Sequence, residues 1–374
     1  MENKSLPKKK IGILSMQRVV NYGSFYQAYA LKQIIKQNIE CDVYFIDIEP
    51  GKNIGELYVE KNRLYYFMRI FDLLFSFSFI KNIKVTLFNR KLKNQFRDIF
   101  YPALKLDKKY DGIFDTVVIG SDEVFNFNQK TTWGYSKMLF GNGLNAKRII
   151  SYAASYGYAT IQDVHKYGLV GEMTTNLSNF ESISVRDKNS QSIVNELLGI
   201  EPLLHLDPVL IYGYKQEISQ CDKPAMTDYI VIYTYQGRIT DDSERDAIVS
   251  FAKVHNKRIV SIFCTYDWCD KVVMPEDVFC VFAWFKYADF VITDTFHGTI
   301  FSIITQQKFA TIVRSTNRQK LTSLLDTLKL SSREYNADSA FEELYQAEID
   351  YTSTNQVLEI QRAESISYLS TYVK

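Results

Sequence analysis

Short apolar runs alternate along the chain with stretches in which apolar residues recur at helical spacing. Residues 10–16 form an apolar run that predicts a β-strand, 24–37 have the spacing of a helix, and 42–48 form a second apolar run. A strand, a helix and a second strand in this order predict a parallel sheet. The same pattern predicts further strands at 116–119, 148–152, 182–185 and 203–206, with helices at 163–180 and 188–198.

A polar stretch at 212–228 interrupts the pattern and predicts a linker, after which strands and helices alternate again. The second series predicts strands at 229–233, 258–263, 290–293 and 309–313, and helices at 241–254, 281–288, 297–305 and 319–328. We therefore predict an α/β fold in which two Rossmann-like domains, residues 1–211 and 229–352, face a cleft. Residues 353–374 predict a last helix that could cross back to the first domain. In such folds the ligand normally binds at the carboxyl ends of the strands.

Residues 58–101 break the alternation and predict a helical insertion in the first domain. Seven of the twenty residues at 61–80 are aromatic, and 81–97 carry six basic residues and no acidic one. An apolar aromatic segment followed by a basic one is typical of an element at a membrane surface, so 62–97 is a candidate for peripheral membrane contact. The same pattern fits a helical hairpin packed on the sheet or a homodimer interface, and the oligomeric state stays open.

The composition excludes several classes of protein. With 374 residues, 46% of them hydrophobic, the chain can bury two cores, which excludes global disorder. The 44 basic and 43 acidic residues nearly cancel, which argues against nucleic acid as a partner. The five cysteines have no CxxC spacing, so we expect reduced thiols, no metal site and a cytoplasmic protein. We expect neither a secretory signal nor a membrane-spanning helix, since the basic N-terminus has no apolar core and the most apolar stretch is short.

Polar residues follow directly after many of the predicted strands, where they would gather at the cleft. His297 stands at a strand-to-helix turn and is followed by Gly298, so backbone amides at this helix N-terminus could bind an anion. A capping turn with Asp294 or Thr295 as the N-cap explains the same residues equally well. The turn at 120–122 fits a site for phosphate or sugar hydroxyls, or a plain helix cap.

Arginines are further candidates for binding an anion. Arg186 follows a predicted strand, and its planar guanidinium suits a carboxylate or a phosphate. A salt bridge with Asp187 or Glu181 would explain it as well. Arg314 and Arg318 flank the turn after a later strand and fit either an anion site or the solvated surface. Neither GxxxxGK[ST] nor GxGxxG occurs in the sequence, so ATP and NAD have no standard binding loop.

Taken in order, the motifs closely resemble those of the polysaccharide pyruvyl transferase family. They are NYGS, IGSDEVFN, ISYAASYG, SISVRD, LDPVLI and ADFVITDTFHGTIFSII, and the likeness extends from about residue 10 to 330. Its most specific parts are 120–122 and the segment around 297–299. The resemblance implies a fold similar to that of B-type glycosyltransferases. It also implies that pyruvate is taken from phosphoenolpyruvate and joined to two hydroxyls of one sugar as a cyclic ketal, without a metal or cofactor, in surface polysaccharide biosynthesis.

On this resemblance we assign His297 as the catalytic acid or base. We also assign Arg186 as a catalytic residue, which binds the anionic groups of the donor. Family members can carry an Arg-Leu-His-Gly segment, whereas Thr295 stands here at the place of the arginine. The donor site would further comprise Thr295, Gly298, Thr299, Arg314 and Arg318, of which either of the last two could replace the family arginine. The acceptor, a lipid-linked oligosaccharide or a polymer, would contact loops of the first domain, with aromatic rings stacking on the sugar. The acceptor residues expected there are Asn21, Tyr22, Gly23, Ser121, Asp122, Glu123, Phe125, Asn126, Tyr152, Ser155 and Tyr156.

Two other functions stay open as alternatives. One is a B-type glycosyltransferase that uses a nucleotide sugar, which the release of a nucleoside diphosphate would reveal. The other is a non-catalytic module that binds lipid-linked sugars. The presence of His297 and Arg186 at predicted strand ends argues against the second alternative.

Overall fold

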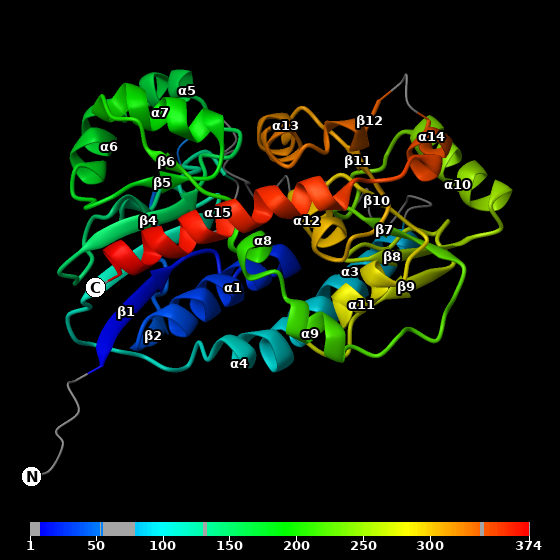
Figure 1. The fold of residues 1–374 in the computed structure, drawn as a ribbon, viewed down its shortest axis with the longest axis horizontal. Helices are drawn as coiled ribbons and strands as arrows, with labels where there is room; N and C mark the ends of the chain where they lie inside the picture. The colour runs from blue at the N-terminus through cyan, green and yellow to red at the C-terminus, as the bar shows by residue number, and fades with distance from the viewer. Residues whose placement is uncertain (1–7, 53, 55–78, 130–132, 337–339, 374) are drawn as a thin grey trace, which may run out of the picture.

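Two separate six-stranded sheets form the framework of the protein (Figure 1). The computed structural model describes residues 8–52, 54, 79–129, 133–336 and 340–373. The first sheet has the strand order β2-β1-β3-β4-β5-β6, and its strands pair in parallel. These strands are β1 (Lys9–Leu14), β2 (Cys41–Phe45), β3 (Thr116–Asp122), β4 (Ile149–Ala154), β5 (Ser184–Val185) and β6 (Leu203–Leu204).

The second sheet has the order β12-β11-β10-β7-β8-β9 and is also parallel. The prediction of an α/β fold with two Rossmann-like domains is therefore confirmed. The short edge strands β9 and β12 extend the second sheet beyond the predicted strands. The strands are β7 (Tyr229–Tyr233), β8 (Arg258–Ile262), β9 (Lys271–Val273), β10 (Phe290–Thr293), β11 (Phe309–Ile312) and β12 (Glu334–Tyr335).

Helices connect the strands close to the predicted positions, with three differences. The helix expected at 163–180 is two helices, because Gly168 adopts a φ of +66° between them. The segment at 212–228 is more than a polar linker, since Tyr214 is fully buried in the core and a short helix, α9, follows it. Two other helices were not predicted, α8 shortly after β6 and α14 at the edge of the second domain. The helices outside the insertion and before α15 are α1 (Tyr22–Asn38), α5 (Ile161–Lys166), α6 (Val170–Leu177), α7 (Lys188–Leu198), α8 (Pro208–Tyr212), α9 (Lys215–Gln220), α10 (Asp242–Val254), α11 (Cys280–Lys286), α12 (Phe296–Ile304), α13 (Arg318–Thr327) and α14 (Phe341–Gln346).

Aromatic side chains form an apolar seam between the two domains. Tyr22 and Tyr26 of α1 lie on the first-domain side of this seam and are fully buried. The ring of Tyr22 lies 5.3 Å from that of Phe263, and the ring of Tyr26 lies 4.6 Å from Phe282 and 5.3 Å from Phe301. Edge and tilted ring pairs of this kind add to the energy of apolar burial. Part of the high aromatic content of the chain therefore holds the domains together.

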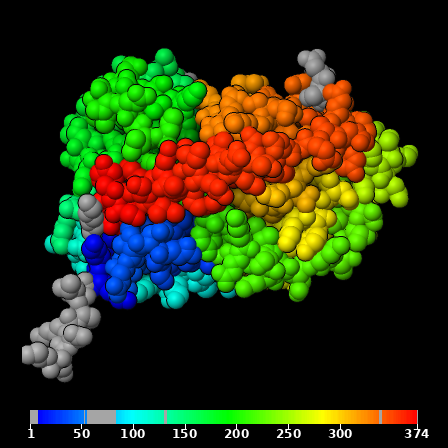
Figure 2. Space-filling model, in the orientation of Figure 1, coloured from blue at the N-terminus to red at the C-terminus, as the bar shows by residue number. Residues whose placement is uncertain are grey.

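The C-terminal helix α15 (Tyr351–Tyr372) spans both domains. It begins beside the second domain, where the Thr354 hydroxyl donates to the carbonyl of Leu328 at 3.1 Å. Near its end the Tyr368 hydroxyl donates to the carbonyl of Ser151 in the first sheet at 2.8 Å. In Figures 1 and 2 this helix, coloured red, lies across the boundary between the two halves of the molecule. The helix thus fastens one domain to the other.

The predicted insertion, 58–101, is described from residue 79 onward, and most of its aromatic part, at 61–78, lies outside the described residues. Gln95, at the end of α3, accepts a hydrogen bond from the Tyr22 hydroxyl at 2.8 Å and donates to the carbonyl of Pro275. The insertion therefore packs against both domains. None of the helices described here is long and apolar enough to cross a membrane. The helical elements are α3 (Phe79–Gln95), a π-helical turn (Phe96–Phe100) and α4 (Tyr101–Leu104).

Candidate active site

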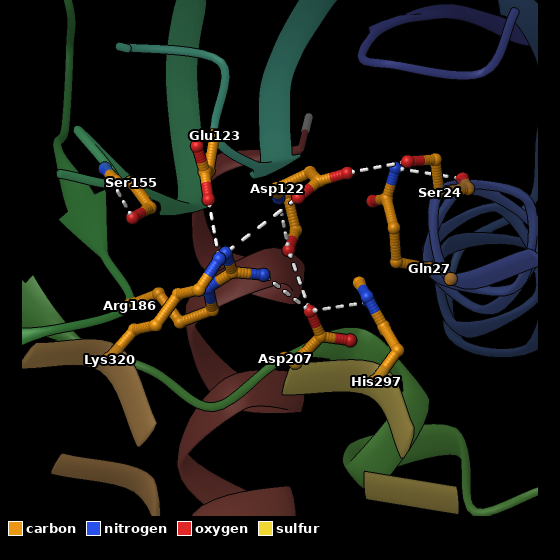
Figure 3. Close-up of polar contacts among 12 residues, drawn as sticks. Ser24, Gln27, Asp122, Glu123, Ser155, Arg186, Asp207, His297 and Lys320 are labelled. Atoms are coloured by element: carbon orange, nitrogen blue, oxygen red, sulfur yellow. Dashed lines mark hydrogen bonds and ion pairs between the residues drawn. The ribbon is translucent and has the colours of Figure 1, made fainter. Parts of the chain in front are cut away.

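A cavity of about 140 Å³ lies between the two domains, at the carboxyl ends of their strands (Figure 3). Its position agrees with the expectation for facing α/β domains. The first domain contributes Met16, Val19, Asn21, Ser24, Asp122, Glu123, Gln129 and Arg186 to the lining, and the second contributes Tyr235, Phe296, His297 and Lys320.

His297 lies in the first turn of α12 and packs directly against α1 of the other domain. A Cβ atom built on Gly23 would lie only 2.2 Å from the His297 Nδ1 and 2.3 Å from its Cγ. Only a glycine at position 23 leaves room for the imidazole ring, so the NYGS motif serves to seat this histidine. The other ring nitrogen, Nε2, lies 3.6 Å from Oδ2 of Asp207 and has no hydrogen-bond partner among the described residues.

Asp207 is fully buried behind the cavity and joins the two predicted catalytic residues (Figure 3). Its Oδ2 accepts a hydrogen bond from Arg186 Nη1 at 2.8 Å, in addition to the contact with His297. Its Oδ1 accepts from the backbone amide of Val209 at 3.0 Å and so caps α8. Burial disfavours ionisation of this carboxyl, but His297 and Arg186 outweigh that effect and lower its pKa to about 2. Asp207 therefore stays charged and holds both side chains in place.

Arg186 has 2% of its side chain exposed, and two carboxylates neutralise it. Besides Asp207, Asp122 lies 3.7 Å away, and the guanidinium sits 4.3 Å from the centre of the Phe296 ring. The sequence left open that Arg186 forms a salt bridge with Asp187 or Glu181. Arg186 does form salt bridges, but its partners are Asp207 and Asp122. Asp187 instead caps α7 by accepting from the amide of Ser190 at 2.8 Å.

Lys320 and Glu123 form an ion pair across the cavity, from different domains, at 2.5 Å. Burial alone would raise the pKa of Glu123, but Lys320 and hydrogen bonding from Asn126 lower it to about 2. Burial opposes the charge on Lys320 as well, but Glu123 raises the pKa of this lysine. A second contact between the domains joins the Asn21 side-chain amide to the Tyr235 hydroxyl at 3.1 Å.

At the N-terminus of α12 the amides of Gly298 and Thr299 are bonded within the turn, which corrects their prediction as ligands of the donor. Thr295 is the N-cap, and its Oγ1 accepts from the amide of Gly298 at 2.9 Å, while its carbonyl accepts from the amide of Thr299 at 3.1 Å. A Cβ on Gly298 would lie 2.1 Å from Oγ1 of Thr293, so this glycine allows close packing inside the domain and makes no room for a ligand. Thr295, Gly298 and Thr299 therefore form the capping turn that was the alternative interpretation.

Neither of the two arginines expected to replace the family arginine lines the cavity. Arg314 forms a bidentate salt bridge with Glu244, with hydrogen bonds of 2.7 and 2.5 Å, and lies 3.2 Å from Asp294. Arg318 is 61% exposed and lies 3.6 Å from Glu334. The cationic side chain that does reach the cavity from this part of the chain is Lys320 of α13.

The residues expected to bind the acceptor lie in different surroundings. Asn21, Asp122 and Glu123 line the cavity, and their contact with an acceptor stays a prediction. The aromatic residues Tyr22, Phe125, Tyr152 and Tyr156 are fully buried. The first two and Tyr156 were expected to stack on the sugar, and this prediction is wrong because they have no free face. Phe125 and Tyr156 pack against each other at 5.4 Å. Ser121, Asn126 and Ser155 are buried behind the loops, where they hydrogen-bond to Asp207, Glu123 and Asp187 respectively.

The sequence analysis gave no site role to Asp207, Lys320, Tyr235 or Phe296. Asp207 directly follows a predicted strand and stands in the LDPVLI motif, but this signal does not show that the carboxylate contacts both Arg186 and His297. Lys320 carries no such signal, since it is one of several polar residues on a surface helix. Within the described part of the chain no group of three or more His, Cys, Asp or Glu side chains could hold a metal ion.

Comparison with known proteins gives one sequence match and several structural ones. The model of a family described as polysaccharide pyruvyl transferase matches residues 21–316, which is most of the chain. No curated protein sequence gives a significant match. Among solved structures, UDP-GlcNAc 2-epimerase of Methanocaldococcus jannaschii is 12% identical, with 95% of this chain and 99% of that chain covered and a TM-score of 0.46.

The UDP-GlcNAc 2-epimerase of Neisseria meningitidis is 11% identical, with 94% of this chain and 99% of that chain covered and a TM-score of 0.46. The O-GlcNAc transferase of Thermobaculum terrenum is 12% identical, with 97% of this chain and 64% of that chain covered and a TM-score of 0.38. We draw no functional statement from likenesses at this level.

Proposed function

The chain belongs to the polysaccharide pyruvyl transferase family, and from that premise we propose that it transfers pyruvate from phosphoenolpyruvate to two hydroxyls of a sugar as a cyclic ketal. The observation that carries this proposal is the small cavity between the domains, which is lined by an imidazole, an arginine and a lysine. Phosphoenolpyruvate carries a carboxylate and a phosphate, and these cations suit both groups.

The size of the cavity supports a small donor. Its volume of about 140 Å³ equals that of four or five water molecules at about 30 Å³ each, below the roughly 300–1,000 Å³ of common drug-sized ligand sites. A three-carbon phosphate ester fits this space better than a nucleotide sugar does. The dimensions thus favour the pyruvyl transferase over the alternative of a B-type glycosyltransferase.

Lys320 is our candidate for the donor phosphate, in place of the arginine that Thr295 replaces. Lysine binds phosphate as a point charge with three donor hydrogens. In the structure Lys320 is paired with Glu123, so the donor phosphate would replace the Glu123 carboxylate at the ammonium group. Arg186, already fixed by Asp207 and by the Phe296 ring, would then bind the donor carboxylate.

His297 would act as the acid that protonates the methylene carbon of phosphoenolpyruvate. Its Nε2 lies 3.6 Å from Oδ2 of Asp207. Protonation converts the methylene to a methyl group and leaves the central carbon electron-poor, so that a sugar hydroxyl can attack it. The second hydroxyl then displaces phosphate, which leaves with the electrons of its carbon–oxygen bond. Of the two hydroxyl protons, one replaces the proton given by His297 and the other leaves with phosphate.

The test is transfer to a panel of galactose-, glucose- and mannose-type acceptors, both free and lipid-linked. Mass spectrometry should show an added pyruvyl group of about 70 Da, together with released phosphate. His297→Ala should abolish transfer, and His165→Ala is the matched control, since His165 is exposed on α5. Release of a nucleoside diphosphate from nucleotide sugars, with phosphoenolpyruvate left intact, would overturn the proposal in favour of a glycosyltransferase. Acceptor binding without turnover of either donor would favour the non-catalytic module.

A further inference from the structure

A large basic hollow lies beside α4, at the end of the insertion, and is lined by other residues than the interdomain cavity. Its volume is about 820 Å³, and five of its lining side chains are cationic while one is acidic. The hollow is lined by Arg18, Arg97, Tyr101, Pro102, Lys105, Leu106, Asp107, Lys108 and Lys109. None of these residues lines the candidate active site.

Helix α3 continues this basic surface through Arg97, which follows it in the π-helical turn. Its inward face buries Leu92 and partly buries Phe88 in the core. On its outward face Ile83 is 42% and Leu87 is 59% exposed, one helical turn apart. This apolar pair is therefore not buried against the described part of the chain.

Cations surround this exposed apolar pair. Residues 83–97 contain five basic residues and no acidic one. Two of the five have a carboxylate partner nearby, since Lys84 lies 3.6 Å from Asp267 and Arg97 lies 2.7 Å from Asp98. The other three, Arg90, Lys91 and Lys93, have no carboxylate partner within the described ranges of the chain.

Carboxylates also reduce the charge of the hollow, but they do not cancel it. Asp47 accepts from both Arg18 and Lys109 at its edge. Lys108 lies 4.7 Å from the centre of the Tyr44 ring, and Lys105 faces the hollow without a carboxylate partner among the described residues. The hollow and the helix together therefore present a net positive surface with two apolar side chains at one end.

We propose that this surface, formed by the outward face of α3 and the basic hollow, docks the protein on an anionic lipid bilayer. Exposed Ile and Leu side chains flanked by lysines and arginines fit the interface of a bilayer, where apolar groups enter the acyl boundary and cations meet phosphates. Nucleic acid would use the cations but not the apolar pair. A soluble anion would use the hollow but not the helix.

The experiment is flotation of the full chain with vesicles of phosphatidylcholine alone or with one quarter phosphatidylglycerol, at low salt. We expect binding to the anionic vesicles only. Lys91→Gln combined with Lys93→Gln should weaken this binding about thirty-fold, because each cation near an anionic surface is worth about a factor of five. The control is Lys253→Gln combined with Lys329→Gln, two exposed lysines of the second domain, and it should bind as the unchanged protein does.

Replacing Ile83 and Leu87 by serine tests the apolar part and should also weaken binding, with the thermal melting temperature preserved. Loss of binding at high salt is expected, since salt screens surface charges. Equal binding to both vesicle types would overturn the proposal, as would equal weakening by the control lysines. Free phosphate that competes fully at millimolar concentration would overturn it too, by pointing to a soluble anion. Because flotation needs no turnover, this result is independent of the proposed reaction.

Discussion

Gly23→Ala tests whether the seat of the imidazole on α1 is required for the proposed chemistry. The added Cβ would lie 2.2 Å from Nδ1 and 2.3 Å from Cγ of His297. Ordinary van der Waals contact is about 3.5 Å, so the ring must move by about 1.3 Å. Misplacement of a catalytic group by about 1 Å can cost about a hundredfold in rate. We therefore expect kcat for pyruvyl transfer to fall about a hundredfold, with a much smaller change in the KM for phosphoenolpyruvate.

The control for this variant is Gly171→Ala, in α6. A Cβ on Gly171 meets nothing within 4 Å, so this enzyme should keep full activity. Alanine is the better helix former than glycine by about 1 kcal/mol, so helix propensity alone predicts that both variants gain stability. Circular dichroism and the melting temperature show whether Gly23→Ala remains folded. A folded Gly23→Ala enzyme with the kcat of the unchanged enzyme would refute the reasoning that this contact positions His297.

Three further predictions concern the charges around the cavity. Asp207→Asn leaves the buried guanidinium of Arg186 without its nearest carboxylate, so the free energy of unfolding in urea should fall by about 3–5 kcal/mol. Lys320→Ala should raise the KM for phosphoenolpyruvate at least about tenfold in steady-state kinetics, because a hydrogen bond to a charged group is worth about 1.5–3 kcal/mol. Lys320→Arg should keep most of the affinity for the donor. Arg318 is exposed, so Arg318→Ala should leave this KM unchanged. The pKa values of Asp207 and Glu123 are lowered to about 2 from 3.8 and 4.5. Their stabilising effect is therefore complete above about pH 5 and is lost as the pH falls toward 2. The melting temperature should fall over the same pH range, and it should fall less steeply in Glu123→Gln.

The position of the site could be predicted from the sequence because parallel strands share one direction. Asp122 ends β3 and Arg186 follows β5 in the first sheet, and His297 stands just beyond β10 in the second, so the order of strands and helices places each at a carboxyl edge that faces the cleft. The sequence could not tell how these residues pair. Asp207 shows why, since the same carboxylate caps α8 and binds Arg186, and a capping signal hides the second role.

The aromatic residues show what the sequence cannot specify. Phe125 and Tyr156 follow strands as closely as the cavity residues do, and both are fully buried. The direction in which a loop side chain points depends on the packing of residues far apart in the chain. A short sequence motif carries no information about that packing. The same limit hid Lys320, because its reach into the cavity depends on how α13 of one domain lies against Glu123 of the other.

The ion pair between Lys320 and Glu123 links donor binding to a proton in the proposed reaction. Burial pushes the pKa of Glu123 upward, and Lys320 is the main group that lowers it. If the donor phosphate takes Lys320, that lowering is lost and the buried carboxylate should bind a proton more readily. We therefore expect proton uptake when phosphoenolpyruvate binds, measured by calorimetry in two buffers of different ionisation enthalpy. Glu123→Gln should bind the donor without this uptake. Uptake of the same size in that variant would mean that the proton goes elsewhere, and His297 would then be the group to test.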